Sequence, residues 1–404
     1  MSGGVHHLSW QAGTVIDIET VRADTPACAD QVFLDSAGSS LPPRQVVDTV
    51  VGHLRREAEV GGYRAATERA EDLAALPLAL ARVVGGEAGT IALTDSATRA
   101  WAQFVSAVPL ERGDRVLITG VEYASNAIML LQRVRAAGIS VEVVPSDAAG
   151  RVDLEALDAM IDDRVRLVSL VHVPSTSGIV NPVREVVDLA HRHGALVVLD
   201  ACQSVGQIDV DVQALGVDAL SATGRKWLRA PRGTGFLYVR PGLASTLEPA
   251  VVDLHGGTWT GADAYELAAD ATRFQLWEGD VAGRLGLGVA AELLLRLGPA
   301  EVERAVAARG HTLRSLLGAV PGVNVHDHGD PLCGIVTFTV DGIDPAQVKG
   351  RLEADGVTVT VGGRHSTLLD LTARGLTGIV RASPHYFVTD AQLEQAAAAV
   401  AHLR

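Results

Sequence analysis

The sequence is poor in lysine and cysteine. Among its 34 Lys and Arg residues only Lys226 and Lys349 are lysine. A GC-rich coding bias accounts for this deficit, yet it leaves two side-chain candidates for chemistry that needs a neutral amine, because arginine keeps its proton in proteins. Cys28, Cys202 and Cys333 are odd in number and widely spaced, which disfavours a disulfide framework or a cysteine-rich zinc site.

Long apolar runs and an excess of basic charge are also missing. The chain has no uninterrupted apolar stretch of about 18 residues, so no membrane-spanning helix is predicted. The formal net charge of −14 disfavours nucleic acid and anionic membranes as partners, since both attract basic patches. The first residues lack a basic segment followed by an apolar core, so no signal peptide is predicted and a cytoplasmic location is expected.

Short apolar runs that alternate with helical patterns indicate an α/β fold. Many of these runs lack polar alternation, as strands do when both of their faces are buried. Strands that alternate with helices build parallel sheets covered on both faces, so we expect a mostly parallel seven-stranded sheet. The predicted strands are Ile91–Thr94, Arg115–Thr119, Ser140–Val144, Leu167–Val171, Leu196–Leu199, Ala219–Ala222 and Gly235–Val239.

The pattern changes after about residue 282, where a small α+β domain is predicted. We expect a large domain over 30–290, with 1–29 as an N-terminal arm and 291–404 as the small C-terminal domain. The elements predicted in this part are helices at Val281–Leu297 and Ala300–Ala319, then a strand at Gly334–Val340, a helix at Pro345–Asp355, strands at Val357–Thr360 and Gly378–Ala382, and a helix at Asp390–Leu403.

Ligands of open α/β sheets bind beyond the carboxyl ends of the strands, so the residues that follow each strand are the candidates. Lys226 lies there beside Arg225, and an amine desolvated next to another cation has a lowered pKa and can attack a carbonyl. Asp200 ends an apolar strand and needs a cationic partner. A structural salt bridge would also satisfy Asp200.

The same edge of the sheet offers groups for a phosphate and an aromatic ring. Ser96, Thr223 and Arg225 suit a phosphate, although Ser96 is also an ordinary helix N-cap. Tyr123 could cover a ring. Pyridoxal 5′-phosphate (PLP) meets every demand: a phosphate, a ring, an aldehyde for the lysine and a basic nitrogen for the acid.

These segments resemble the class V aminotransferase and cysteine desulfurase family of fold type I PLP enzymes. The strongest matches are Asp200–Gly206, Thr223–Trp227 and Gly233–Gly235, and the resemblance extends from Leu34 to Pro384. It implies a fold type I architecture and a homodimer. The roles that it implies are Lys226 as the Schiff-base lysine, Asp200 on the pyridine nitrogen, Gln203 on the ring oxygen, Ser96, Ala97, Thr223 and Arg225 on the phosphate, and Arg381 on the substrate carboxylate.

The sequence departs from this family at four positions. Ser366 stands where desulfurases carry a nucleophilic cysteine, and Ser175 stands for an asparagine near the ring oxygen. Tyr123 or Ala124 replaces the histidine that stacks on the ring. Glu278 replaces a threonine with which the partner subunit contacts the phosphate. A protein persulfide is therefore not expected.

The segments Glu57–Tyr63 and Ser383–His385 are similar to a subgroup that contains the ergothioneine-pathway C–S lyase, lincosamide-pathway PLP enzymes and isopenicillin N epimerase-like proteins. This resemblance implies a C–S β-lyase of secondary metabolism, including antibiotic biosynthesis, that cleaves an S-substituted cysteine to a thiol, pyruvate and ammonia. Tyr63 would lie near the substrate, and Trp259 and Trp277–Glu278 would reach the partner's site. Decarboxylating oxidative deamination, epimerisation and transamination stay open as alternatives.

Overall fold

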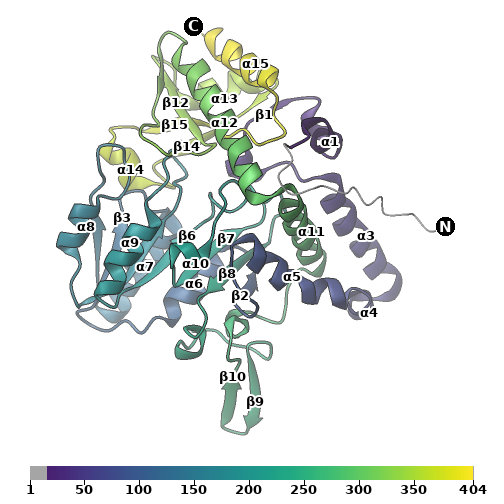
Figure 1. Cartoon of the computed structure of the whole chain (residues 1–404), viewed down its shortest axis with the longest axis vertical. Helices are drawn as coiled ribbons and strands as arrows, with labels where there is room; N and C mark the ends of the chain where they lie inside the picture. Colours follow the sequence, from purple (N-terminus) through teal and green to yellow (C-terminus); the bar gives the residue numbers. More distant parts are fainter. Residues whose placement is uncertain (1–15, 404) are drawn as a thin grey trace.

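The computed structural model describes residues 16–403, and its centre is a seven-stranded sheet in the order β2-β8-β7-β6-β5-β3-β4 (Figure 1). β8 is antiparallel to both of its neighbours, and the other neighbouring pairs are parallel. The predicted seven-stranded, mostly parallel sheet is confirmed. Its strands are β2 (Ile91–Thr94), β3 (Arg115–Thr119), β4 (Ser140–Val144), β5 (Val165–Val171), β6 (Leu196–Asp200), β7 (Ala219–Thr223) and β8 (Gly235–Val239).

Helices cover both faces of this sheet because alternate strand residues point to opposite sides. Trp101 and Phe104 of one helix pack with Val116 and Val198 on one face, whereas Val186 packs in the core of the other face. The helices of the first face are α6 (Ala97–Ala107) and α7 (Ala124–Ala137), and those of the second are α8 (Leu154–Met160), α9 (Val183–Arg192) and α10 (Val212–Leu215).

A second, antiparallel sheet in the order β11-β12-β15-β14 lies in the C-terminal part, with helices packed against it (Figure 1). The predicted single strand Val357–Thr360 is wrong: β13 (Val357–Thr358) pairs with β1 (Val32–Phe33), and β14 (Thr360–Gly363) pairs with β15. The other elements here are β11 (Val323–Val325), β12 (Val336–Val340), β15 (Gly378–Ala382), α12 (Pro299–Gly318), α13 (Pro345–Ala354), α14 (Leu368–Ala373) and α15 (Asp390–Ala401).

Several elements lack a counterpart among the sequence-based predictions. They include a group of N-terminal helices that packs against α11 (Val281–Leu297), and a hairpin that projects from the body of the molecule (Figure 1). The expected domain boundary near residue 290 falls within α11 and stays a prediction. These elements are α1 (Ile18–Ala23), α2 (Ser36–Ser39), α3 (Arg44–Val60), α4 (Gly62–Thr67), α5 (Ala70–Val83), β9 (Gly257–Gly261) and β10 (Ala264–Leu267), with 3-10 turns at Pro26–Cys28, Ala244–Thr246 and Ala271–Phe274.

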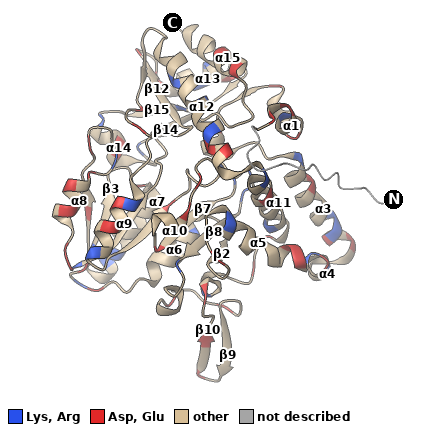
Figure 2. Cartoon of the chain, viewed as in Figure 1, with Lys and Arg blue, Asp and Glu red and all other residues tan. Residues whose placement is uncertain are grey.

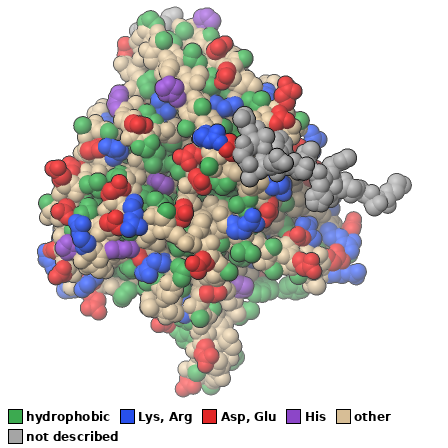
Figure 3. Space-filling model, in the orientation of Figure 1, with side chains coloured by type: hydrophobic (Ala, Val, Ile, Leu, Met, Phe, Trp, Pro, Cys, Tyr) green, Lys and Arg blue, Asp and Glu red, His purple; other side chains and the backbone are tan. Residues whose placement is uncertain are grey.

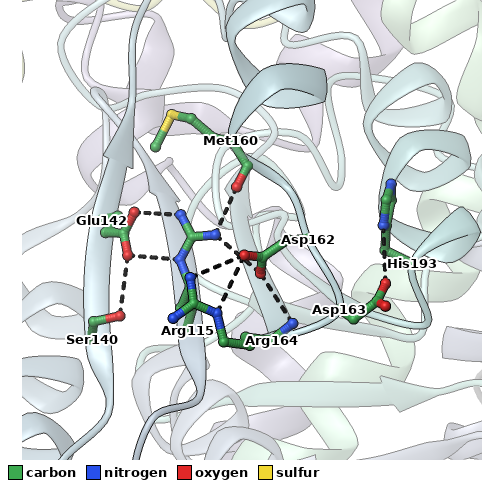
Figure 4. Close-up of polar contacts among 8 residues, drawn as sticks. All are labelled: Arg115, Ser140, Glu142, Met160, Asp162, Asp163, Arg164 and His193. Atoms are coloured by element: carbon green, nitrogen blue, oxygen red, sulfur yellow. Dashed lines mark hydrogen bonds and ion pairs between the residues drawn. The ribbon is translucent and has the colours of Figure 1, made fainter.

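An ion-pair cluster holds the amino ends of β3 and β4 together (Figure 4). Arg115 pairs with Glu142 at 2.5 Å and with Asp162 at 3.1 Å, and it donates to the Met160 carbonyl at 2.8 Å. The hydrogen bond from Arg115 lowers the pKa of Glu142. Because the cluster lies at the amino ends of the strands, it fixes the sheet edge away from the carboxyl ends, where ligands bind.

Charged side chains of both signs are interspersed along the helices and over the face drawn in space-filling form (Figures 2 and 3). Within residues 16–403 no helix is both long and apolar enough to cross a bilayer. In the same part of the chain, no group of three or more His, Cys, Asp and Glu side chains is placed to hold a metal ion.

Candidate active site

A cavity of about 320 Å³ lies at the carboxyl ends of the central strands. β8 runs opposite to β7, so its preceding residues Gly233 and Thr234 lie at the same edge as the ends of β6 and β7. Nine residues predicted from the sequence line this cavity: Ser96, Ala97, Tyr123, Ser175, Asp200, Gln203, Thr223, Arg225 and Lys226. The structure therefore brings together the side chains proposed for the amine, the acid and the phosphate contacts.

Lys226 lies in the turn that follows β7, where it lines the cavity. Burial lowers the pKa of its ammonium, and the nearby charge of Arg225 acts in the same direction. A lowered pKa increases the fraction of neutral amine, which is the form that attacks a carbonyl. The environment of Lys226 thus fits the role of an amine nucleophile.

Asp200 ends β6 and is held by donors on both of its oxygens. Asn126 Nδ2 donates to Oδ2 at 3.1 Å, and the Cys202 backbone N–H donates to Oδ1 at 3.0 Å. The side chain does not form the structural salt bridge that the sequence left open, since both partners are neutral. A buried carboxylate with neutral partners could still take a cationic ligand nitrogen.

The N-terminus of α6 forms an anion-binding end of the cavity. Ser96 is the N-cap and accepts from the Arg99 N–H at 3.3 Å, so the capping role left open by the sequence is present, and Ser96 also lines the cavity. Gly235 lets α6 approach closely, because a Cβ at this position would lie 2.8 Å from the Ser96 carbonyl carbon. With the cations Arg225 and Arg232 beside it, this end fits a phosphate group.

Gln203 and Ser175 are joined across the cavity wall. Gln203 Nε2 donates to the Ala37 carbonyl at 3.1 Å and to Ser175 Oγ at 3.5 Å, and the Trp227 indole N–H donates to Gln203 Oε1 at 3.0 Å. These bonds fix the Gln203 amide, so its orientation does not depend on a ligand. Amine, acid and anion-binding end together match the donor set that PLP requires.

Arg381 on β15 is buried next to the cavity rather than among its lining residues. Nη1 donates to the Ser175 carbonyl at 3.1 Å, and Nη2 pairs with Asp35 at 3.3 Å. Its Nε is buried and has no hydrogen-bond partner in the structure. A guanidinium with an unused donor could bind a carboxylate.

Tyr123, rather than Ala124, lines the cavity. The loop that contains Ser366 packs against it, because the Ala124 N–H donates to the Ser366 carbonyl at 2.9 Å. Ser366 Oγ donates to the Gly363 carbonyl at 2.9 Å, and Thr367 lines the cavity. The position expected for a cysteine nucleophile therefore lies at the edge of the site and carries a hydroxyl.

Tyr63 and Trp259 are not among the residues that line this cavity. Tyr63 is 79% exposed, and its ring centroid lies 6.2 Å from that of Trp277. Trp259 is 80% exposed on the projecting β9–β10 hairpin. Glu278 lines a separate cavity of about 250 Å³. Within one chain, these side chains lie outside the site.

The sequence analysis did not assign roles to Asn126, Arg232 or Cys202, which also line the cavity. Asn126 and Arg232 carried a usable signal: Asn126 lies soon after the predicted strand Arg115–Thr119, Arg232 lies just before the predicted strand Gly235–Val239, and each bears a polar or cationic group. Their contacts depend on the packing of α7 and of the loop before β8.

Residues 32–396 match the aminotransferase class-V family. A probable cysteine desulfurase of Methanothermobacter thermautotrophicus is 28% identical over 384 residues, which cover 93% of this chain and 95% of the relative. The cysteine desulfurase CsdA of Escherichia coli has the same fold, with a TM-score of 0.89, 22% identity, and coverage of 96% of this chain and 98% of that chain.

Two solved structures of C-DES also share the fold at 24% identity. One has glycine covalently linked to its PLP cofactor, with a TM-score of 0.86 and coverage of 94% of this chain and 98% of that chain. The other is a cystine C–S lyase complex with the product cysteine persulfide, with a TM-score of 0.85 and coverage of 93% and 99%. The family match spans most of the chain and explains the donor set of the cavity: the chain belongs to the aminotransferase class-V family of PLP-dependent enzymes.

Proposed function

We propose that this protein is a C–S β-lyase that cleaves an S-substituted cysteine to a thiol, pyruvate and ammonia. The observation that carries the proposal is the absence of an activated thiol among the described residues. Burial raises the pKa of Cys28, raises that of Cys202 well above its usual range, and raises that of Cys333 to about 11. Because the thiolate is the nucleophile, none of these cysteines is suited to accept sulfur.

The position of Ser366 supports the same conclusion. It lies on the loop packed against Tyr123, and its hydroxyl donates to the Gly363 carbonyl. A β-elimination needs no protein nucleophile for sulfur, since the thiolate leaves with its electron pair. The C–S lyase C-DES shows that this fold accommodates such chemistry in another protein.

We assign the PLP contacts to the residues of the cavity. Lys226 would bind the cofactor aldehyde, Asp200 the pyridine nitrogen and Gln203 the ring oxygen, with Ser175 next to Gln203. Tyr123 would cover the ring. The phosphate would bind at the N-terminus of α6 through Ser96, Ala97, Thr223 and Arg225.

In the reaction, Arg381 binds the substrate carboxylate and orients the Cα–H bond. Lys226 would remove the Cα proton as general base. Bound PLP supplies an electron sink for the electrons of the broken Cα–H bond. The bond between Cβ and sulfur then breaks, the thiolate takes up a proton, and water releases pyruvate and ammonia.

Incubation of the holoenzyme with S-alkyl cysteines tests the assignment. Equimolar pyruvate, ammonia and thiol are expected, and Lys226→Ala is the matched inactive control. Carbon dioxide or hydrogen peroxide in place of pyruvate would show a decarboxylating oxidative deaminase. Retained carboxylate with inverted Cα would show an epimerase that uses Tyr123 or His365 as second acid or base, and a keto acid formed only with an amino acceptor would show an aminotransferase.

We also propose a homodimer with shared active sites. Tyr63, Trp259 and Leu254 are large apolar side chains that are mostly exposed, and a partner chain would cover such side chains. A second copy would bring Trp259 and Tyr63 toward a substrate. Mixing the Lys226→Ala and Trp259→Ala variants tests this: partial recovery of activity is expected if each site uses both chains, and sedimentation as a monomer would contradict it.

The resemblance to enzymes of secondary metabolism, antibiotic biosynthesis included, leads us to propose a cysteine conjugate as the natural substrate. Turnover of S-alkyl cysteines with bulky sulfur substituents, compared with free cysteine, measures this preference. A preference for free cysteine, with alanine formed and the sulfur atom transferred to a protein cysteine as a persulfide, would identify a desulfurase and overturn the proposal.

A further inference from the structure

A buried carboxyl group beside the cavity has no part in the chemistry assigned to Lys226. Glu122 follows β3 and is 2% exposed. Its Oε1 accepts hydrogen bonds from the Tyr123 N–H and from Asn126 Nδ2, both at 2.9 Å, and its Oε2 accepts from Ser169 Oγ at 2.8 Å. Three donors around one buried side chain form a built site for a carboxylate, because an ionised group without donors would be strongly destabilising.

Asn126 connects this carboxyl group to the cofactor site. Its Nδ2 donates to Glu122 Oε1 at 2.9 Å and to Asp200 Oδ2 at 3.1 Å. An amide nitrogen carries two hydrogens, so each carboxyl group takes one. The position of Asp200 therefore depends on an amide that Glu122 holds.

We propose that Glu122 is a positioning residue for Asp200 and acts through Asn126. It turns the amide nitrogen of Asn126, rather than the carbonyl oxygen, toward Asp200. When ionised, it accepts a stronger hydrogen bond from Asn126, so the orientation of that amide, and with it the position of Asp200, depends on the charge of Glu122. Glu122 thus sets how strongly the cofactor withdraws electrons, without touching it.

The groups around Glu122 allow its charge to change near neutral pH. Burial raises its pKa to about 7; the donors Ser169 and Asn126 oppose this rise, and the charge of Asp200 adds to it. Ser169 can reverse its hydroxyl and accept from a protonated Oε2, so the contact survives both states.

The other titratable groups of the site come from neighbouring elements. Asp200 lies on β6, His172 follows β5, Tyr123 precedes α7, Cys202 follows β6 and Lys226 follows β7. Burial lowers the pKa of His172 to about 4 and raises that of Cys202. These two groups therefore stay neutral where Glu122 titrates.

The pH dependence of the visible absorbance of bound PLP tests the proposal without measuring turnover. We expect a step with a midpoint near 7 in the wild-type holoenzyme. Glu122→Gln should lose the step, and Ser169→Ala should move it to higher pH because the charged form loses a donor. Ser221→Ala is the matched control, because it removes a buried serine hydroxyl that has no hydrogen-bond partner. This variant should leave the absorbance step at the same pH. An unshifted midpoint in Ser169→Ala, or a retained step in Glu122→Gln, would overturn the proposal.

The dissociation constant of PLP gives an independent measurement. Asn126→Leu removes one of two donors to Asp200 and should weaken PLP binding about tenfold. If Glu122 acts through Asn126, adding Glu122→Gln to Asn126→Leu should cause no further loss. If the two substitutions weaken PLP binding additively in the double variant, Glu122 acts by a route other than Asn126, and the assigned connection is refuted.

Discussion

Arg229 joins three parts of the chain close to Lys226. It is buried, and its backbone N–H donates to the Lys226 carbonyl at 3.0 Å. Its guanidinium donates to the Leu41 carbonyl at 2.9 Å, to the Tyr386 hydroxyl at 2.7 Å and to Thr25 Oγ1. The N-terminal segment, the Lys226 loop and the residues after β15 therefore share one side chain.

Replacement of Arg229 by lysine measures how much these hydrogen bonds contribute to the free energy of unfolding. Lysine keeps the charge, but its single nitrogen cannot occupy the positions of Nε, Nη1 and Nη2 at once, so about two of the three neutral acceptors lose their donor. Each hydrogen bond to a charged group contributes about 1.5–3 kcal/mol, and the guanidinium also lies 4.7 Å from the Phe387 ring centroid. We expect Arg229→Lys to lower the free energy of unfolding by about 3–5 kcal/mol.

The backbone of Arg229 supplies a second comparison. Its φ is +61°, in the left-handed region that glycine adopts without penalty. Arg229→Gly should therefore be about 1 kcal/mol more stable than Arg229→Ala, although both lose the guanidinium.

Urea unfolding followed by tryptophan fluorescence, with PLP bound and removed, measures these differences. Arg192→Lys is a suitable control, because Arg192 pairs with Asp158 on the surface. A loss below about 1 kcal/mol in Arg229→Lys would show that the three guanidinium bonds contribute little. Equal stability of the glycine and alanine variants would refute the backbone argument.

Three further predictions concern the site. Lys226→Ala should lose the visible absorbance of covalently bound PLP and about 10²–10⁴-fold of turnover, and retained absorbance would contradict the assignment. Arg381→Lys should raise KM for the amino acid about tenfold or more in steady-state kinetics, because a bidentate contact is lost; an unchanged KM would refute it. Burial lowers the pKa of His172 from 6.5 to about 4, so the folded state should lose up to about 3 kcal/mol of stability as pH falls through this range, while the unfolded chain takes up the proton. His172→Gln should abolish that loss in urea unfolding at several pH values, and an unchanged pH profile would contradict it.

The end of β6 could be predicted because Leu196–Leu199 is a continuous apolar run, and that of β7 because the short run Ala219–Ala222 precedes a glycine. Such runs mark the position of Asp200 and the turn that contains Lys226 without any knowledge of packing. The contact between Glu122 and Ser169 could not be predicted in the same way. It requires β3 to lie beside β5 with Ile118 opposite Ser169, and the order of strands in the sheet decides this.

The elements that were missed have weak local signals for identifiable reasons. The exception is α3, where Val46, Val50 and Leu54 recur at helical spacing, so its sequence does predict a helix even though only Val46 and His53 are buried. Its N-cap, Pro43, supplies no side-chain hydrogen bond. The β9–β10 hairpin is exposed on both faces and therefore lacks the alternation that identifies a half-buried strand.

The two lysines occupy opposite environments, and this makes the protein unusually simple to label. Lys349 is 37% exposed on α13 and pairs with Glu353 at 2.8 Å, whereas Lys226 lines the cavity. Under native conditions, an amine-reactive reagent should therefore modify only one side chain, that of Lys349, in addition to the terminal amine. If borohydride first reduces the bond between Lys226 and PLP so that it cannot hydrolyse, Lys226 becomes a second site after denaturation only in molecules that carried no cofactor. The ratio of the two labels in a mass spectrum then reports the fraction of chains that carry the cofactor.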